Sequence, residues 1–136
     1  MSIQVIICDY VDDSGENVIS AWMSTISVRA KASINVKLEH ILAQTPQKDW
    51  HKSRVAAKRK GEPDLWEVKV YSDNVQWRPL GFFGPKSGTL GTFTLLVGAL
   101  EKGGKLNPPG ATDEAQARKA KVTINPQKYR RIHDYK

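Results

Sequence analysis

Residues 64–83, DLWEVKVYSDNVQWRPLGFF, decide the fold, because they hold two hydrophobic runs separated by residues that favour a tight turn. Asp73 and Asn74 tolerate the positive backbone angles of a two-residue hairpin turn, so we place them at its tip. This choice fixes the register, because the turn determines which residues face each other. The predicted pairs are Lys69 with Arg78, Val70 with Trp77, and Tyr71 with Gln76.

The predicted hairpin has one apolar face and one charged face, since strand side chains alternate between the two faces of a sheet. The apolar face, fit for burial, consists of Trp66, Val68, Val70 and Trp77, and the polar face consists of Glu67, Lys69, Tyr71, Gln76 and Arg78. Like charges directly opposite each other on a sheet are unfavourable. Lys69 and Arg78 are therefore either neutralised by a neighbour such as Glu67, in an ordinary solvated charge ladder, or they hold an anion.

The segments around the hairpin predict an α+β fold in a single domain, residues 1–136. Asp13 followed by Glu16 has the spacing of a helix cap, and the apolar residues after it have helical spacing. Pro79 cannot donate to a sheet ladder, so it predicts a bulge or an unpaired edge. The predicted elements are a strand over 3–9, helices over 16–29 and 32–44, a long basic loop over 46–63 with room for one helical turn, antiparallel strands over 65–71, 75–83 and 92–101, a short helix over 112–121, and a basic tail over 122–136.

Length and composition are typical of a soluble protein with one domain. The chain has 136 residues, of which 40% are hydrophobic and 26% charged, and no apolar run is long enough to span a membrane. The first residues lack the features of a secretory signal peptide, so we expect a cytoplasmic protein without membrane association. Cys8 is the only cysteine. It cannot form an internal disulfide, and we expect it to be a strand residue in preference to a catalytic thiol.

Positive charge is concentrated in two segments of a chain whose formal net charge is +7. Residues 46–60 contain six basic residues against one acidic residue, and residues 118–136 contain seven against one. Such clusters attract polyanions, phosphate groups in particular, while many basic loops and tails only increase solubility. The charge distribution favours a nucleic-acid partner.

The sequence lacks the common catalytic motifs. It contains no Gly-rich phosphate loop ending in Lys-Ser/Thr, no Gly-x-Ser-x-Gly and no His-Glu-x-x-His, which excludes the commonest nucleotide-binding, hydrolase and zinc-protease signatures. Its three histidines are far apart in sequence, and its acidic residues have no spacing that is typical of a metal site. We therefore expect neither a metal ion nor a cofactor.

Residues 63–121 resemble the phage-derived HigB-like branch of the RelE/ParE toxin superfamily. The resemblance is carried, in order, by a Leu-x-Glu-x-Lys strand (Leu65, Glu67, Lys69), a strand with Arg78, a Leu-Leu strand (Leu95, Leu96) followed by Lys102, and prolines before a helix with Ala117 and Arg118. Each motif is weak by itself, and the resemblance rests on their order and spacing. It implies a RelE-like fold, with an N-terminal strand, a helical hairpin, a three-stranded antiparallel meander, and a short C-terminal helix with a basic tail.

The resemblance implies the toxin of a type II toxin–antitoxin system, which is an endoribonuclease that cuts mRNA on the ribosome without a metal ion. A small antitoxin of helix-turn-helix type, encoded nearby, would silence it. The RNA 2′-hydroxyl would attack its adjacent phosphate, and the protein would supply cations and proton-transfer groups. The implied catalytic residues are Lys69, Arg78, Lys102 and Arg118; the RNA-binding residues are Lys58, Arg59, Lys60, Tyr71, Lys105, Arg130 and Arg131; and the candidates for proton transfer are Tyr129, His133 and Tyr135.

Two other functions stay open at the level of the sequence. The family has an aromatic residue and two adjacent lysines where this chain has ALEKGGK at residues 99–105. A non-catalytic protein on the same fold would bind nucleic acid or a host protein, because a fold alone does not determine activity. A phage-encoded adaptor or inhibitor that uses the basic segments as its interface is the third possibility.

Overall fold

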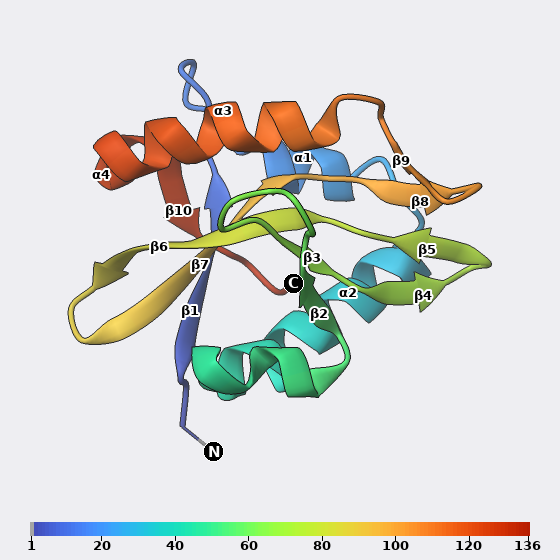
Figure 1. The fold of residues 1–136 in the computed structure, drawn as a ribbon, viewed down its shortest axis with the longest axis horizontal. Helices are drawn as coiled ribbons and strands as arrows, with labels where there is room; N and C mark the ends of the chain where they lie inside the picture. The colour runs from blue at the N-terminus through green and yellow to red at the C-terminus, as the bar shows by residue number, and fades with distance from the viewer. Residues whose placement is uncertain (1) are drawn as a thin grey trace.

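The computed structural model describes residues 2–136 and has an α+β fold with an N-terminal strand, helices and largely antiparallel sheets (Figure 1). The helices are α1 (Val18–Met23), α2 (Val28–His40), α3 (Ala111–Ile124) and α4 (Pro126–Tyr129), with the 3-10 helices η1 (Leu42–Gln44) and η2 (Gln47–Ser53). The strands are β1 (Val5–Tyr10), β2 (Ala56–Lys58), β3 (Trp66–Val68), β4 (Val70–Ser72), β5 (Val75–Trp77), β6 (Leu80–Ser87), β7 (Leu90–Val97), β8 (Leu100–Lys102), β9 (Lys105–Asn107) and β10 (Arg130–Ile132). None of the helices in this part of the chain is both long and apolar enough to cross a membrane.

Within residues 2–136 the strands form two sheets. One sheet has six strands in the order β10-β1-β7-β6-β3-β2, and the other has four in the order β4-β5-β8-β9. Neighbouring strands are antiparallel except β1 and β7, which are parallel. The order of a strand, two helices, a meander of strands and a helix agrees with the sequence prediction, and the sheets are larger than the predicted meander.

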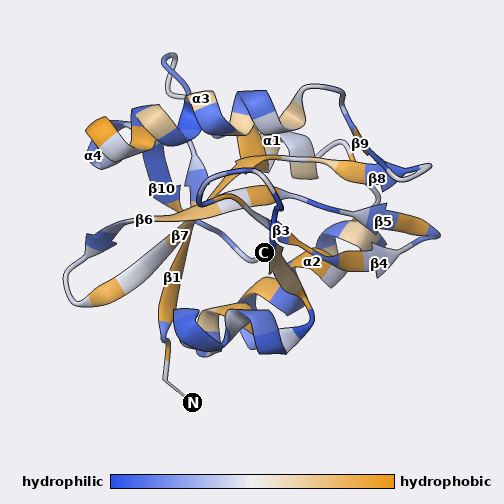
Figure 2. Ribbon diagram, viewed as in Figure 1, coloured by the Kyte–Doolittle hydropathy of each residue, from blue (hydrophilic) through white to orange (hydrophobic). Residues whose placement is uncertain are grey.

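Two hydrophobic cores lie on opposite faces of the strands. One core joins α1, α2 and η2 to residues such as Ile7, Trp66 and Phe93, and the other joins α3 to residues such as Leu80 and Leu96. The central strands are predominantly hydrophobic, whereas α3 carries hydrophilic residues along much of its length (Figure 2). The sheet therefore forms a middle layer, with α1 and α2 on one side and α3 on the other.

The predicted hairpin register is confirmed. Val70 pairs with Trp77 and Tyr71 with Gln76, and the tip residues Asp73 and Asn74 have φ angles of 53° and 60°. The same register continues between β3 and β6, where Glu67 pairs with Leu80. The predicted apolar face is confirmed as well, since Trp66, Val68, Val70 and Trp77 are all buried in the core beneath α1 and α2.

Each of the three predicted long strands is divided into two at the same level of the sheet. Lys69 separates β3 from β4, Arg78 and Pro79 separate β5 from β6, and residues 98–99 separate β7 from β8. Pro79 has no N–H to give to the ladder, as predicted. A Cβ atom on Gly98 would clash with the Trp22 ring, so only a glycine fits where the chain passes this indole.

The predicted pairing of Lys69 with Arg78 is kept at this break. The Val68 N–H donates to the Pro79 carbonyl at 2.9 Å, in the same register as β4 and β5, so Lys69 and Arg78 lie opposite each other. Their own N–H groups point outward, that of Lys69 to the Val55 carbonyl and that of Arg78 to the Ala99 carbonyl, both at 2.8 Å, as in any non-hydrogen-bonded pair of an antiparallel ladder.

The predicted helix boundaries are wrong, and the reason is the position of the caps. The Asn17 side chain accepts from the Ser20 N–H and starts α1, and the Ser27 side chain accepts from the Ala30 N–H and starts α2. Residues 30 and 31, which lie between the two predicted helices, are therefore part of α2. The predicted cap by Asp13 is replaced by Asp12, whose side chain accepts from the N–H groups of Ser14 and Glu16 in a turn before α1.

The long loop predicted over 46–63, with room for one helical turn, contains the 3-10 helix η2 and also the strand β2, which was not predicted. Trp50 on η2 is fully buried, donates from Nε1 to the Thr45 carbonyl at 2.8 Å, and packs against the rings of Trp66, Phe83 and Phe93. β2 pairs with β3 and forms one edge of the six-stranded sheet. Nonlocal aromatic packing, which a single-sequence pattern does not display, orders this polar segment.

The predicted basic tail over 122–136 is likewise part of the fold. α3 continues to Ile124, and β10 pairs antiparallel with β1, so that Cys8 faces Ile132. His133 follows β10, donates its N–H to the Ile7 carbonyl at 2.9 Å and is buried. Cys8 lies in β1, as predicted, and is buried.

Trp50→Ala should lower the free energy of unfolding by about 3–5 kcal/mol, because it removes a fully buried ring from an aromatic cluster. Lys52→Ala, an exposed position on the same 3-10 helix, is the matched control and should change it by less than about 0.5 kcal/mol. Urea unfolding followed by far-UV circular dichroism measures both. Equal effects of the two substitutions would contradict the placement of Trp50 in the core.

Candidate functional site

The polar face of the predicted hairpin carries a cluster of interacting side chains at the level where the three long strands are divided. Tyr71, Gln76 and Glu101 face one another across β4, β5 and β8. Arg78 lies two residues from Gln76, so strand alternation places it on the same face. This is the face that α3 covers farther along the sheet, where Leu80 belongs to the α3 core.

Arg78 is the centre of this site. It is only 9% exposed, and its guanidinium donates from Nη1 to the Trp77 carbonyl at 2.9 Å and from Nη2 to Gln76 Oε1 at 2.8 Å. Its Nε lies 4.0 Å from Glu67 Oε2 and 4.0 Å from Glu101 Oε1. That Nε is buried and has no hydrogen-bond partner among residues 2–136. One donor of a positioned guanidinium therefore remains unused between two carboxylates.

A second arginine completes the cluster. Arg59 follows β2 and donates from Nη1 to Glu67 Oε2 at 3.2 Å. The Arg59 Nε is also buried without a hydrogen-bond partner in the described part of the chain. Two guanidinium groups and two carboxylates thus balance in charge, and we call these four residues, Arg59, Glu67, Arg78 and Glu101, the arginine–glutamate cluster.

The cluster has the groups that metal-independent phosphate chemistry requires. A guanidinium presents planar donors that match the oxygens of a phosphate, and a carboxylate beside it can accept a proton from an attacking hydroxyl. Neither glutamate was among the residues assigned from the sequence. Glu67 was visible on the polar strand face, whereas the place of Glu101 follows only from the pairing of β5 with β8.

Of the other three predicted catalytic residues, only Lys69 lies beside Arg78, opposite it across the two strands. Lys69 is exposed at the break. Lys102 pairs with Lys105 next to the β8–β9 turn, and alternation places it on the face opposite to Glu101. Arg118 donates to the Leu96 carbonyl at 2.8 Å, pairs with Glu114 at 2.9 Å and lies over the Tyr10 ring. Its guanidinium is thus bound to β7 and α3.

The predicted RNA-binding residues fall into separate groups. Lys58, Arg59 and Lys60 lie at β2, Tyr71 is 68% exposed on β4, and Lys105 begins β9. Arg130 and Arg131 lie on β10, where they donate to the carbonyls of Pro85 and Gly15. β2 and β10 are the two opposite edges of the six-stranded sheet. The two basic segments of the sequence therefore do not form one continuous patch on that sheet.

The predicted proton-transfer residues lie near β10 and away from the cluster. Tyr129 donates to Asp13 Oδ1 at 2.7 Å. His133 is buried, with Nδ1 2.6 Å from Asp9 Oδ1 and Nε2 2.8 Å from Asn35 Oδ1. Tyr135 packs edge-on against the His133 ring, and burial raises the pKa of its hydroxyl to about 12. These contacts tie β10 to β1 and α2.

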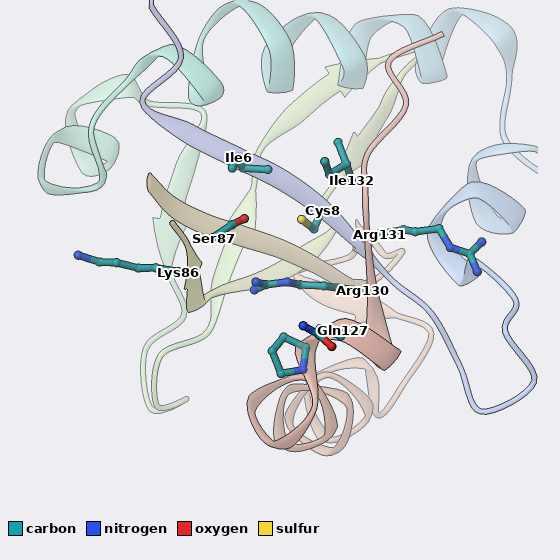
Figure 3. A pocket seen from close by; sticks show the side chains of 9 residues that line it. Ile6, Cys8, Lys86, Ser87, Gln127, Arg130, Arg131 and Ile132 are labelled. Carbon is teal, nitrogen blue, oxygen red and sulfur yellow. The ribbon is translucent and has the colours of Figure 1, made fainter. Parts of the chain in front are cut away.

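A groove of about 340 Å³ lies between β10 and the end of the β6–β7 hairpin (Figure 3). Ile6, Cys8 and Ile132 line it, and Lys86 and Arg130 extend along it. Burial raises the pKa of the Cys8 thiol to about 11, which makes the thiol a poor nucleophile near neutral pH. No three His, Cys, Asp or Glu side chains within residues 2–136 come together in a way that could hold a metal ion.

Comparison of the chain with protein-family models, with curated proteins and with solved structures found no match. The arginine–glutamate cluster and the order of the elements are therefore the grounds for a function.

Arg78→Ala should lower the free energy of unfolding by about 1–3 kcal/mol, because it removes buried hydrogen bonds and leaves two glutamates without their shared cation. Lys69→Ala, at an exposed position of the same break, should change it by less than about 0.5 kcal/mol. Denaturant midpoints of both variants test this. An Arg78→Ala protein as stable as the wild type would show that the guanidinium contributes nothing to the fold.

Stability should fall between about pH 9 and pH 11 partly because of Cys8. Its pKa is higher in the folded chain than in the unfolded chain, so the unfolded thiol ionises first and alkaline pH favours unfolding. Tyr135 acts in the same direction at slightly higher pH. Cys8→Ala should therefore lose less stability than the wild type between about pH 8 and pH 10.5, as measured by urea midpoints at both values. Parallel losses in the two proteins would rule out a contribution from Cys8.

Proposed function

We propose that this protein is a toxin of the RelE/ParE type, a metal-independent endoribonuclease that cuts mRNA on the ribosome in the cytoplasm. A small antitoxin encoded nearby would be its inhibitor. The observation that carries the proposal is the Arg78 guanidinium, whose unused Nε lies 4.0 Å from a carboxylate on either side. The order of a strand, helices, a meander and a helix, which the resemblance implies, supports it.

The cluster divides the work of RNA cleavage among its members. The 2′-hydroxyl oxygen forms a bond to the adjacent phosphorus, and its proton passes to a carboxylate. The bond from phosphorus to the 5′-oxygen breaks, and the departing 5′-oxygen takes a proton from water, which leaves a 2′,3′-cyclic phosphate and a free 5′-hydroxyl. Glu101 suits this role, because its side chain is 34% exposed, against 14% for Glu67. Glu67 is bound to Arg59 and holds Arg78 in place, and Arg78 stabilises the negative charge that develops on the phosphate.

The surrounding residues keep the roles that the resemblance implies. Lys69 is exposed beside Arg78 and adds positive charge for the phosphate. Lys58 and Lys60 extend that charge along the edge of the sheet at β2. Lys102 and Arg118 would assist only after their side chains leave the positions that they occupy in the free protein.

A second candidate, a non-catalytic inhibitor that binds nucleic acid or a host protein on the same fold, is favoured by one observation. Two of the predicted catalytic arginines already donate to groups of their own chain, Arg78 to Gln76 and Arg118 to Leu96. Such bonds are typical of structural arginines, and they would leave the basic edges of the sheet as a binding surface.

The activity test uses substitutions that keep the volume of each side chain. Glu101→Gln and Arg78→Lys should each slow the cleavage of a reporter mRNA on ribosomes by on the order of a hundredfold, because they remove the proton acceptor and the planar donors. Glu16→Gln and Arg29→Lys are matched controls at exposed positions and should cleave at the wild-type rate. Growth arrest on induced expression should follow the same order.

Two outcomes would contradict the proposal. Wild-type protein that binds RNA and never cuts it would establish the non-catalytic alternative. Full activity of a folded Glu101→Gln or Arg78→Lys protein would remove that residue from the catalytic assignment. Denaturant midpoints of every variant separate a loss of activity from a loss of folding.

A further inference from the structure

A second cavity, of about 480 Å³, lies on the other side of β2 and β3 from the arginine–glutamate cluster. Trp66 and Ala56 are its buried lining residues, and Lys48, His51 and Lys58 are exposed around it. This volume lies within the range of small-molecule sites, about 300–1,000 Å³. We call it the β2 pocket.

The lining of the β2 pocket selects an anion that carries a flat apolar group. No Asp or Glu lines it, and Asp49 on the same 3-10 helix is paired with Lys52 at 3.6 Å. The Lys58 ammonium lies 5.8 Å from the centre of the Trp66 ring, as in a cation–π contact. A nucleotide combines the two features required, a base for the apolar floor and a phosphate for the cations.

The position of the β2 pocket relates it to the cluster. Ala57 pairs with Glu67 and Lys58 pairs with Trp66 in the ladder of β2 and β3. Adjacent residues of a strand point to opposite faces, so Glu67 and the β2 pocket lie on the two sides of the same strand pair. Because β2 is the edge of its sheet, a flexible single strand of nucleic acid that passes over this edge reaches both the β2 pocket and the arginine–glutamate cluster.

The groove at β10 has similar chemistry but presents fewer cations to a ligand. Arg130 donates to the Pro85 carbonyl at 2.6 Å, and Arg131 points away from the groove toward Gly15 (Figure 3). The β2 pocket is larger than this groove, and it lies on the opposite face of the strand pair, β2 and β3, that carries Glu67. It is therefore the better candidate for a site that works together with the cluster.

We infer that the β2 pocket is a nucleotide subsite, and that it selects single-stranded RNA by taking up one unstacked nucleotide next to the bond held at the arginine–glutamate cluster. This inference rests on the proposed function and adds the substrate class. A base within a duplex is stacked on both faces and paired along one edge, whereas an unpaired nucleotide can turn into a protein pocket. Phosphate contacts from Lys48 and Lys58 make the binding dependent on salt.

The binding test uses Glu101→Gln protein, because this variant should bind RNA without cutting it and the measurement of binding does not depend on cleavage. Adenosine 5′-monophosphate should shift the backbone amide NMR signals of Ala56, Ala57 and Lys58, and inorganic phosphate or adenosine alone should shift them less. Lys48→Glu and Lys58→Glu should each weaken binding of an unstructured RNA octamer at least tenfold. Lys128→Glu, the same charge reversal at an exposed position on α4, should leave it within about twofold. A perfect duplex of the same sequence should bind more weakly than the octamer.

The outcomes separate this inference from the proposed function. Shifts that centre on Lys86 and Arg130, equal shifts with phosphate alone, or equal binding of duplex and octamer would each overturn the subsite. Nucleotide binding at the β2 pocket in a wild type that never cuts RNA would keep the subsite and end the proposed catalysis. Cleavage by Lys58→Glu with an unchanged KM would keep the proposed catalysis and end the subsite. Unchanged denaturant midpoints confirm that the variants are folded.

Discussion

The absence of an N–H group on Pro79 is the constraint on which the arrangement of the sheets depends. Pro79 accepts from the Val68 N–H at 2.9 Å and cannot return a bond, and each of the three long strands is divided at this level. Gly98 makes the same interruption possible on the neighbouring strand, because the Trp22 ring occupies the space that a side chain would need. One meander thereby becomes parts of two sheets that share a boundary.

This boundary explains why Arg78 differs from an ordinary surface arginine. Beside the interruption, its backbone N–H turns to Ala99 of the next strand, and its side chain is enclosed by groups from three strands. Glu67 arrives from β3 and Glu101 from β8. A flat, uninterrupted hairpin would leave the same residue in a solvated row of charges, which is the simpler interpretation of the sequence. Each of these charges would contribute little to stability on an open surface, and their enclosure together fixes the position of the Arg78 guanidinium.

The sequence was sufficient wherever local chemistry decided the structure. Asp73 and Asn74 determine the turn, and the turn determines the hairpin register and its buried face. The sequence pattern was insufficient where contacts between residues far apart in the chain determine the structure. β2 and β10 are short edge strands with basic residues, and each is defined by its pairing with another segment, β2 with β3 and β10 with β1. Of the site, Arg78 and Glu67 were visible on one strand face, whereas the contribution of Glu101 depends on a pairing between segments far apart in the chain.

The position of β1 has a consequence for how the protein is made. This strand is synthesised before the other strands of its sheet, yet its two neighbours there are β7, residues 90–97, and β10, residues 130–132. Such long-range pairing folds slowly, since the entropy of closing large loops is lost before the contacts form. A partly synthesised chain therefore has no completed central sheet, and β1 stays an unpaired hydrophobic segment until the second half of the protein has been translated.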